Sequence, residues 1–415
     1  MSHAPELITD AEHLARILAA VPRLPARRVA LADGGWVGDV LGRALAADVC
    51  SGVDLPGFTN SAMDGYALRA EDAADGELPV VGDIPAGDTR ELTCAPGKAW
   101  RIMTGAPVPP GPGVIVVPVE QTDVPPGPVP LPESVTVNAA DPARSHVRVA
   151  GSSLPAGSRV AAVGTLLDAG TLAALVSAGV RCVDAYCAPR VAVISTGDEL
   201  AAWPVAPGEA QLPDSNLPMV TALAAAAGAG DVAGMRAGDR AGSLAALLDA
   251  AAENADIIVT TGGISAGAFD VVRATVEPTG CAWFGRVDQR PGGPQGLGRW
   301  GEAALVCLPG NPVAAWVSFH LYVAPLIAAC AGAPHPSARP RLTARAGAGF
   351  TPPRGTSPQV VPVRLDFTGA VPEAHPFSAG PNPSSDVTAL SGITGFTVLG
   401  PGPIPADITV HLTRS

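Results

Sequence analysis

The sequence predicts a multidomain protein in which an α/β region with a parallel sheet is flanked by β-rich parts. The chain has 415 residues, which exceeds the usual size of one domain. Between residues 189 and 335, short apolar β-type runs alternate with helical patterns, as in a parallel α/β sheet. On both sides of this region, β-type runs lie between Gly/Pro turns.

The composition favours a loop-rich globular protein. Hydrophobic residues make up 47% and charged residues 15% of the chain, which allows a sizeable core and excludes wholesale disorder. The 48 glycines and 44 prolines follow no repeat, so they exclude collagen and favour many turns. The net charge of −12 argues against a nucleic-acid partner, because such proteins usually present a basic surface.

Cysteine usage and apolar segments indicate a cytoplasmic protein. Seven scattered cysteines without a C-x-x-C pair disfavour a metal cluster or a disulfide scaffold and favour a reducing compartment. The first ten residues lack the order of a signal peptide. Val313–Ala333 has the length of a membrane span, but Pro325 interrupts it and a Pro-Gly-Asn-Pro turn precedes it. We therefore expect a buried globular helix there and no membrane association.

Periodicity predicts the elements of the first half. Leu7–Leu18 has apolar residues at helical spacing, which predicts an amphipathic helix. Residues 49–149 are predicted to form a small, mostly β module, and Leu154–Gly179 turns helical again. The β-type runs of the module are Pro79–Val81, Ala99–Met103, Val114–Val119 and Ser134–Val137.

The α/β region begins near Pro189. Its predicted strands are Val191–Ile194, Val232–Met235, Ile257–Thr260 and Ala304–Leu308, and its helices are Leu217–Ala227, Ser243–Ala252 and a segment from Val313 onward. We expect Asp214, Ser215 and Asn216 to supply cap-type side chains for the first of these helices. Beyond residue 333, strands at Val360–Leu365, Thr397–Leu399 and Ile408–Leu412 predict a small C-terminal β domain.

Three predicted strands of the α/β region end in loops rich in Gly, Ser, Thr and Asp. The loops are Ser195–Glu199, Thr260–Gly267 and Leu308–Asn311. Ligands bind outside the carboxyl ends of the strands in such sheets, where glycines let backbone N–H groups approach an anion and helix N-termini favour negative charge. One such loop alone is better interpreted as an ordinary turn, but three together favour a site for a phosphate or a polar heterocycle.

Acidic residues accompany these loops, and we expect them at the same edge of the sheet. They are Asp198, Glu199, Asp256, Asp270 and, further along, Asp214. Carboxylates beside a phosphate site usually hold Mg²⁺ or a nucleotide hydroxyl. The alternative interpretation makes Asp198 a turn residue and Asp270 a helix cap. Residues 59–67, taken by themselves, are interpreted as an ordinary loop.

Six motifs occur in an order that resembles a known family. They are NSAMDGYA at 60–67, MTGAPVPP at 103–110, STGDEL at 195–200, DSN at 214–216, GGISAG with Asp270 at 262–270, and LPGNPV at 308–313. Each motif alone is weak, but together they resemble the molybdopterin molybdenumtransferase family, which is MoeA-like and similar to the C-terminal part of gephyrin. The resemblance covers essentially the whole chain.

The resemblance implies an elongated cytoplasmic homodimer. Its expected domains are a discontinuous linker domain (1–48 and 146–185), an inserted β-rich domain (49–145), a MogA-like molybdopterin-binding α/β domain (186–335) and a C-terminal β-barrel (336–415). The implied function belongs to molybdenum cofactor biosynthesis: molybdate is inserted into adenylylated molybdopterin with Mg²⁺-dependent release of AMP. The site is expected to be shared between subunits, with transient contact to other cofactor-biosynthesis proteins.

The resemblance also implies roles for individual residues. Asp64, Glu199 and Asp256 are expected to hold Mg²⁺ and molybdate as catalytic and metal-binding residues, and Arg286 and Arg290 to neutralise negative charge. The residues expected to bind the pterin and its phosphates are Thr196, Gly197, Asp198, Asp214, Ser215, Asn216, Thr261, Gly262, Gly263, Ser265, Gly267, Asp270, Pro309, Gly310 and Asn311.

Four positions depart from the family pattern, namely Ser153, Ala268, Gly293 and Ala314. Ser153 stands where an acidic residue is expected, and Gly293 cannot replace a lysine. These losses favour an alternative, a non-catalytic molybdopterin-binding or scaffold homologue that has lost insertase activity. A third hypothesis is a nucleotide-dependent transferase that acts on another phosphorylated metabolite. The retained Asp64, Glu199 and glycine-rich loops favour the insertase.

Overall fold

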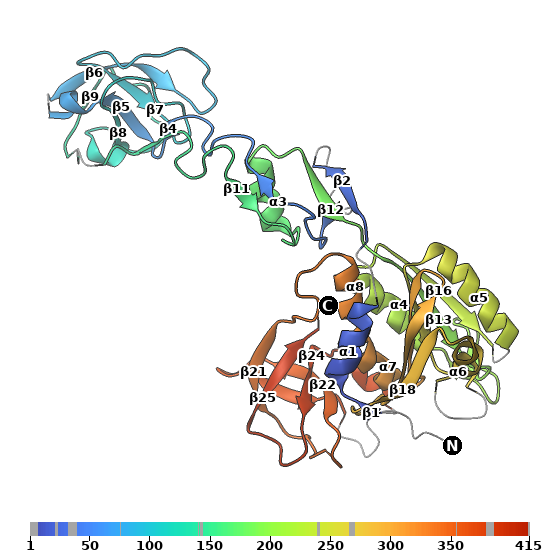
Figure 1. The fold of residues 1–415 in the computed structure, drawn as a ribbon. Coiled ribbons are helices and arrows are strands. Elements are labelled where there is room, and N and C mark those ends of the chain that lie inside the picture. Colours follow the sequence, from blue (N-terminus) through green and yellow to red (C-terminus); the bar gives the residue numbers. More distant parts are fainter. Residues whose placement is uncertain are drawn as a thin grey trace.

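The computed structural model shows an elongated molecule (Figure 1). It describes residues 7–20, 24–31, 40–74, 76–139, 141, 144–238, 241–264, 270–353, 355–378 and 386–413. A β-rich part forms one end, the α/β part and a barrel lie side by side at the other, and a narrow connecting part joins them (Figure 1). The predicted fold class, an α/β unit combined with β-rich units and a C-terminal barrel, is confirmed.

The chain enters the α/β part through a short strand and a capped helix. Strand β1 (Leu7–Ile8) pairs in parallel with β18 (Ala282–Val287), and helix α1 (Asp10–Ala19) begins after Thr9. Thr9 and Glu12 form a reciprocal capping box, with Glu12 N donating to Thr9 Oγ1 at 3.1 Å and Thr9 N donating to Glu12 Oε2 at 2.8 Å. The helix predicted from Leu7 therefore starts too early, because Thr9 sets its beginning.

The connecting part consists of two strand pairs and one helix. β2 (Ala26–Ala30) pairs antiparallel with β12 (Cys182–Tyr186), and β3 (Val49–Cys50) with β11 (Arg159–Ala161). Asp168 is the N-cap of helix α3 (Ala169–Ser177), and its carboxylate accepts from Thr171 N at 2.7 Å. The prediction that Leu154–Gly179 is helical is therefore wrong over its first half, because Pro155 and the left-handed Gly157 (φ +80°) break the helix before β11.

The β-rich part is built on a five-stranded sheet with the order β8-β5-β7-β6-β9. Gly65 opens β5, and a Cβ there would lie 2.0 Å from the carbonyl oxygen of Val117, so only glycine fits. This close pairing fixes the position of Asp64 directly before the strand. The strands of this part are β4 (Asn60–Ser61), β5 (Gly65–Arg69), β6 (Glu77–Ile84), β7 (Ala99–Ile102), β8 (Val114–Pro118), β9 (Ser134–Thr136) and β10 (Val147–Arg148).

The α/β part contains a seven-stranded sheet with the order β1-β18-β19-β20-β17-β13-β16. All of its strands run parallel except β19, which is antiparallel to both neighbours. The predicted parallel sheet is correct for the central strands and wrong at β19, because a tight turn at Gly301 makes β19 and β20 a hairpin. The remaining bounds are β13 (Arg190–Thr196), β16 (Asp231–Ala237), β17 (Ile257–Thr261), β18 (Ala282–Val287), β19 (Pro294–Trp300) and β20 (Ala303–Leu308).

Helices cover both faces of this sheet. Val191 and Val193 of β13 pack into one core cluster, and the intervening Ala192 and Ile194 pack into another, as strand alternation requires. The segment Pro312–Cys330 has a mean hydropathy of 1.7 in its most apolar stretch, of which 78% is buried, so it is a core helix as predicted. The helices are α4 (Asn216–Ala226), α5 (Ala241–Asn254), α6 (Val271–Val276), α7 (Pro312–Ser318), the π-helical η4 (Phe319–Val323) and α8 (Ala324–Cys330).

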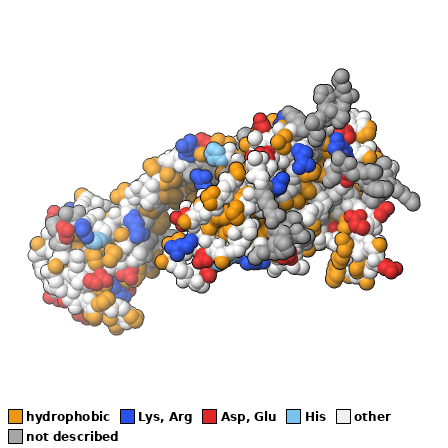
Figure 2. Space-filling model, turned by 90° about the horizontal axis from the view of Figure 1, so that it is seen from below, with side chains coloured by type: hydrophobic (Ala, Val, Ile, Leu, Met, Phe, Trp, Pro, Cys, Tyr) orange, Lys and Arg blue, Asp and Glu red, His pale blue; other side chains and the backbone are white. Residues whose placement is uncertain are grey.

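The C-terminal part is a closed barrel with the strand order β21-β23-β22-β24-β25. Its strands are β21 (Arg341–Ala346), β22 (Gln359–Asp366), β23 (Glu373–Pro376), β24 (Gly395–Leu399) and β25 (Asp407–Leu412). Basic and acidic side chains are interspersed on the face of the molecule shown in Figure 2. The barrel is tied to the α/β part at Arg290, whose N–H donates to Pro358 O at 2.9 Å and whose carbonyl accepts from Val360 N at 2.7 Å.

Candidate active site at the carboxyl edge of the sheet

The parallel strands β13, β16, β17 and β20 bring the loops that follow them to one edge of the sheet. β18 ends at the same edge, because it is antiparallel to β19 as β20 is. Thr196 Oγ1 donates to Thr261 O at 3.1 Å, and Gly262 N donates to Leu308 O at 3.1 Å. The three glycine-rich loops predicted from the sequence are therefore joined to one another in their described residues.

Glycines let the backbones of these loops approach closely. Gly262 has a φ of +91°, and a Cβ there would lie 2.8 Å from Thr196 O. A Cβ at Gly310 would lie 3.2 Å from Gly262 Cα. Side chains are thus excluded at the centre of the edge, which leaves a backbone surface of the kind that anions and flat heterocycles approach.

Asp214 lies at the centre of a buried polar network. Its side chain is 5% exposed and accepts from Ser195 Oγ at 2.5 Å and from Leu217 N at 3.1 Å. Arg236 Nε lies 3.5 Å from its Oδ2. The expected capping role of Asp214 is confirmed, whereas Ser215 stands at the N-cap of α4 without a side-chain cap hydrogen bond.

Two buried polar atoms at this edge lack a partner among the described residues, namely Asn216 Oδ1 and Thr261 Oγ1. Asn216 Nδ2 donates to Gly310 O at 2.7 Å, so its amide bridges two loops while its oxygen is left over. Buried polar groups are normally hydrogen-bonded, so these two atoms are candidates for ligand contacts. Asn311 instead caps α7, because its Oδ1 accepts from Ala314 N at 3.0 Å. Pro309, two residues earlier, is buried.

A hollow of about 490 Å³ lies at the ends of β13 and β16. Asp198 lines it, and a Cβ at Gly238 would lie 2.7 Å from Asp198 Oδ1. Glu199 is exposed, and its carboxylate turns back toward Gly197. A Cβ at Gly197 would lie 2.4 Å from Glu199 Oε2. Mg²⁺ is usually held by one or two carboxylates together with substrate phosphates, so this pair fits it. Among the described residues, no group of three His, Cys, Asp or Glu side chains could hold a metal alone.

Asp256 does not lie at this edge, which corrects the sequence-based expectation. It directly precedes β17 and therefore stands at the amino end of the strand. Its carboxylate accepts from Arg190 N at 2.8 Å and pairs with Arg190 Nη2 at 3.0 Å. Arg190 is the first residue of β13, so this ion pair closes the edge of the sheet opposite the glycine-rich loops.

Asp64 lies in the β-rich part, at the other end of the elongated chain from β13 (Figure 1). Its exposed carboxylate accepts from Thr104 N at 2.6 Å and from Thr104 Oγ1 at 2.7 Å. The Thr104 hydroxyl and then its N–H hold the pKa of this carboxyl below the ordinary value. Within one chain, Asp64 is a fixed anion that does not reach the sheet edge.

Arg286 and Arg290 are both exposed and lie at and just after the carboxyl end of β18. A Cβ at Gly293 would lie 3.5 Å from Arg286 Nη2, so a side chain at position 293 would sit beside this guanidinium. The buried side chain of Gln295 stabilises the loop after Arg290, because its Nε2 donates to Gly292 O at 2.8 Å. The structure thus brings both arginines to the predicted edge.

The remaining predicted residues fall into two groups. Asp270 occupies the N-cap position of α6, and Ser265 and Gly267 lie outside the described residues. Sequence reasoning placed Ser195 in a glycine-rich loop without a role of its own, and it left out Arg236. The sequence did hold a signal for both residues. Ser195 directly follows the apolar run Val191–Ile194, and Arg236 directly follows Val232–Met235, so each lies where a predicted strand ends.

The fold and the candidate site together define a class of protein. Its members have an α/β domain with glycine-rich loops at the carboxyl edge of the sheet, joined to a β-rich part and a barrel. Residues 8–179 match the MoeA N-terminal region (domain I and II), and residues 192–329 match a probable molybdopterin binding domain. Together these models span most of the chain. The protein belongs to the molybdopterin molybdenumtransferase family, which confirms the resemblance found in the sequence.

Curated relatives and solved structures agree with this assignment. The chain is 41% identical over 328 residues to molybdopterin molybdenumtransferase 2 of Mycobacterium tuberculosis, covering 76% of this chain and 78% of that protein. It is 34% identical to molybdopterin molybdenumtransferase of Nostoc sp., covering 75% and 72%. The fold matches the molybdopterin biosynthesis moeA protein of Pyrococcus horikoshii with a TM-score of 0.76 at 21% identity, over 98% of this chain and 100% of that one.

Proposed function

We propose that this protein inserts molybdate into adenylylated molybdopterin and releases AMP in a Mg²⁺-dependent reaction. The observation that carries the proposal is the close approach of the Gly262 loop to both Gly310 and Thr196, since Thr196 directly precedes the turn that carries Asp198 and Glu199. The names of the curated relatives support the reaction class. Molybdate and the pterin are substrates, and Mg²⁺ is the only resident ion that the proposal requires.

The residues of the edge act by positioning and by electrostatics, as is typical of nucleotidyl and phosphoryl chemistry. The backbone at Gly262 and Gly310 accommodates the flat pterin and its phosphate. Arg286 and Arg290 add positive charge at the same edge, where the pyrophosphate would lie. Asp198 and Glu199 would hold Mg²⁺, which supplies further neutralisation of the phosphate charge when it is bound.

We also propose that the enzyme is a cytoplasmic homodimer and that Asp64 completes the site of the partner subunit. Two features support this arrangement. Asp64 is exposed and fixed by Thr104, yet β5 lies far from β13 in one chain (Figure 1). A two-fold dimer would bring each β-rich part to the other subunit by symmetry.

The test of activity is AMP release from adenylylated molybdopterin by the full chain, with and without molybdate and with and without Mg²⁺. We expect AMP only when both are present. Glu199→Gln should abolish AMP release, whereas Glu209→Gln, which changes another exposed glutamate ten residues further along, should leave it unchanged. Release from unrelated adenylylated compounds, but not from this one, would support the third hypothesis instead.

The same assay separates the insertase from a scaffold homologue. Ser153 and Gly293 are the residues that favour the scaffold, since neither can supply the charge expected at its position. Saturable binding of the pterin without AMP release would establish the scaffold and refute the insertase.

The shared site is tested by complementation between two inactive variants. Asp64→Asn and Glu199→Gln lie on different parts of the chain, so a mixed dimer would carry one intact and one doubly altered site. With random exchange, half of the dimers are mixed and about a quarter of the wild-type activity should return. Activity that stays at the level of the single variants would refute sharing, and Glu91→Gln, exposed in the β-rich part, serves as the control for Asp64→Asn.

A further inference from the structure

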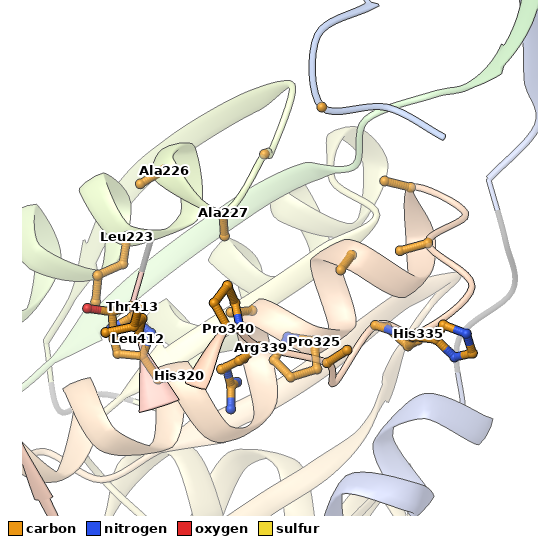
Figure 3. A pocket seen from close by; sticks show the side chains of 18 of the residues that line it. Leu223, Ala226, Ala227, His320, Pro325, His335, Arg339, Pro340, Leu412 and Thr413 are labelled. Carbon is orange, nitrogen blue, oxygen red and sulfur yellow. The ribbon is translucent and has the colours of Figure 1, made fainter. Parts of the chain in front are cut away.

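A cavity of about 150 Å³ lies where the α/β part, the barrel and the connecting part meet (Figure 3). Its walls come from the end of α4, from η4 and α8, from the segment before β21 and from the end of β25. Most of the lining is apolar, with Leu223, Phe319 and Pro325 among its residues. None of the residues assigned to the sheet edge takes part in it, so it is a separate site.

Two nitrogen atoms of the lining residues are buried without a hydrogen-bond partner among the described residues. They are His320 Nε2 and Arg339 Nη2. The side chain of His320 is only 7% exposed, and none of the ion pairs between described residues includes Arg339. Unpaired polar groups are costly in an apolar interior, so two of them at one cavity indicate that a polar ligand belongs there.

The charges of the two side chains determine which ligand would fit. Burial, reinforced by the nearby Arg339, lowers the pKa of His320 to about 3, so its imidazole is neutral. Burial lowers the pKa of Arg339 to about 10, which still leaves the guanidinium protonated at neutral pH. The cavity therefore presents one fixed positive charge together with one neutral ring that can donate a hydrogen bond from Nε2.

Both side chains are held in place by their surroundings. The guanidinium of Arg339 lies 5.4 Å from the ring centroid of Phe396, and the ring of His320 packs edge-on against Trp316 at 4.3 Å. His320 lies in the π-helical turn η4, just before Pro325, and such turns recur at functional sites. The site is thus preorganised by the packing of the barrel against the α/β part.

We propose that this cavity binds a short organic carboxylate. The carboxylate would accept hydrogen bonds from Arg339 Nη2 and His320 Nε2, and its carbon chain would lie against Leu223, Phe319 and Pro325. One guanidinium matches one carboxylate in charge and in planar geometry. A doubly charged, strongly hydrated anion such as phosphate fits less well, because the apolar walls would strip its water without replacing it. The volume is below the range of drug-sized pockets, which keeps the ligand short.

The proposal is tested by calorimetric titration of the full-length protein with butyrate, with its neutral analogue butyramide and with inorganic phosphate. We expect saturable butyrate binding with a Kd of about 1 mM or below and at least tenfold weaker binding of the other two. Arg339→Gln should weaken butyrate binding at least tenfold. Arg341→Gln removes the same charge from an exposed position two residues away and should leave binding unchanged.

A second measurement does not depend on any variant. The Nε2 resonance of His320 in the wild-type protein should shift on addition of butyrate and stay in place with butyramide. Equal binding of butyrate and butyramide would show an apolar cavity without a carboxylate site and would overturn the proposal. Tighter binding of phosphate, or a butyrate Kd above about 1 mM, would overturn it as well.

Discussion

Replacing Gly262 by alanine should disrupt the sheet edge more than the same change at Gly280. Both glycines lie in the α/β part with a left-handed backbone, at φ +91° and +72°. A Cβ at Gly280 meets nothing within 4 Å, whereas a Cβ at Gly262 would lie 2.8 Å from the carbonyl oxygen of Thr196. That oxygen cannot easily retreat, because Thr196 ends a strand that is paired on both sides. The comparison therefore separates the cost of the clash from the cost of the backbone conformation.

The expected magnitudes follow from these two costs. Gly280→Ala should destabilise the protein by about 1–2 kcal/mol, the cost of a left-handed conformation with a Cβ. Gly262→Ala adds overpacking against fixed backbone and should cost about 1–3 kcal/mol more. For a domain of this size the added cost corresponds to a decrease in Tm of about 2–12 °C.

The assay combines thermal unfolding with AMP release for both variants. Gly280→Ala should retain activity in proportion to its folded fraction, whereas Gly262→Ala should lose it even at temperatures where it is folded. If Gly262→Ala unfolds at the same temperature as Gly280→Ala, the loops are not packed as described and the reasoning is refuted. If both variants keep full activity, the edge is not where the substrate binds.

Three further changes test the electrostatics. His13 is fully buried, and neither of its ring nitrogens has a hydrogen-bond partner among the described residues. Burial lowers its pKa to about 4, so only the unfolded chain takes up a proton between about pH 4 and 6.5. The stability of the wild type should fall as the pH falls through that window, and His13→Leu should weaken this dependence in urea unfolding at pH 7 and pH 5. Arg236→Gln leaves the buried Asp214 with one donor fewer and should cost about 1–3 kcal/mol in the same assay. Thr104→Val removes the hydroxyl that holds down the pKa of Asp64, so that pKa should rise toward its ordinary value in a carbon-13 NMR titration.

Each of these expectations has a result that contradicts it. An unchanged pH dependence in His13→Leu would mean that the ring is hydrated in the folded protein. Full stability of Arg236→Gln would mean that the Ser195 hydroxyl and the Leu217 N–H alone satisfy the buried carboxylate. Because the Asp64 pKa is lowered in the folded protein, the hydrogen bond from Thr104 stabilises the folded state at pH values above the ordinary carboxyl pKa. This contribution is lost as the pH falls through the pKa that Asp64 has in the folded protein, and Thr104→Val should reduce it. An Asp64 pKa that does not move would exclude the hydroxyl as its cause.

The central strands could be predicted because their chemistry is local. β13, β17 and β20 are buried apolar runs that end in polar turns, so both their type and their ends can be read from the sequence. Strand β19 could not be predicted in this way. Its sequence contains Gly296 and Gly298, and glycines in a short segment usually indicate a turn. A Cβ at Gly298 would lie 2.2 Å from Cys281 O, so this glycine permits close strand pairing and marks no turn. The four domain boundaries inferred from the sequence stay a prediction.

The candidate site shows a similar division. The rule that loops meet at the carboxyl edge placed the three glycine-rich loops correctly, since it depends only on chain direction. It failed for Asp256, which precedes its strand and so lies at the opposite edge with Arg190. Arg236 escaped notice because its role depends on Asp214, a partner 22 residues earlier that only the fold brings within 3.5 Å.

The position of Asp64 is the strongest argument that one chain does not hold the whole site. Thr104 donates two hydrogen bonds to the Asp64 carboxylate, which lower its pKa and leave the group exposed. The edge of the sheet carries Arg286 and Arg290 next to its own loop carboxylates Asp198 and Glu199. Strand β5, which directly follows Asp64, lies at the opposite end of the molecule from this edge (Figure 1). In the proposed two-fold dimer, a second copy of the chain would bring its Asp64 to this edge, and the loss of activity in Asp64→Asn would be repairable in a mixed dimer.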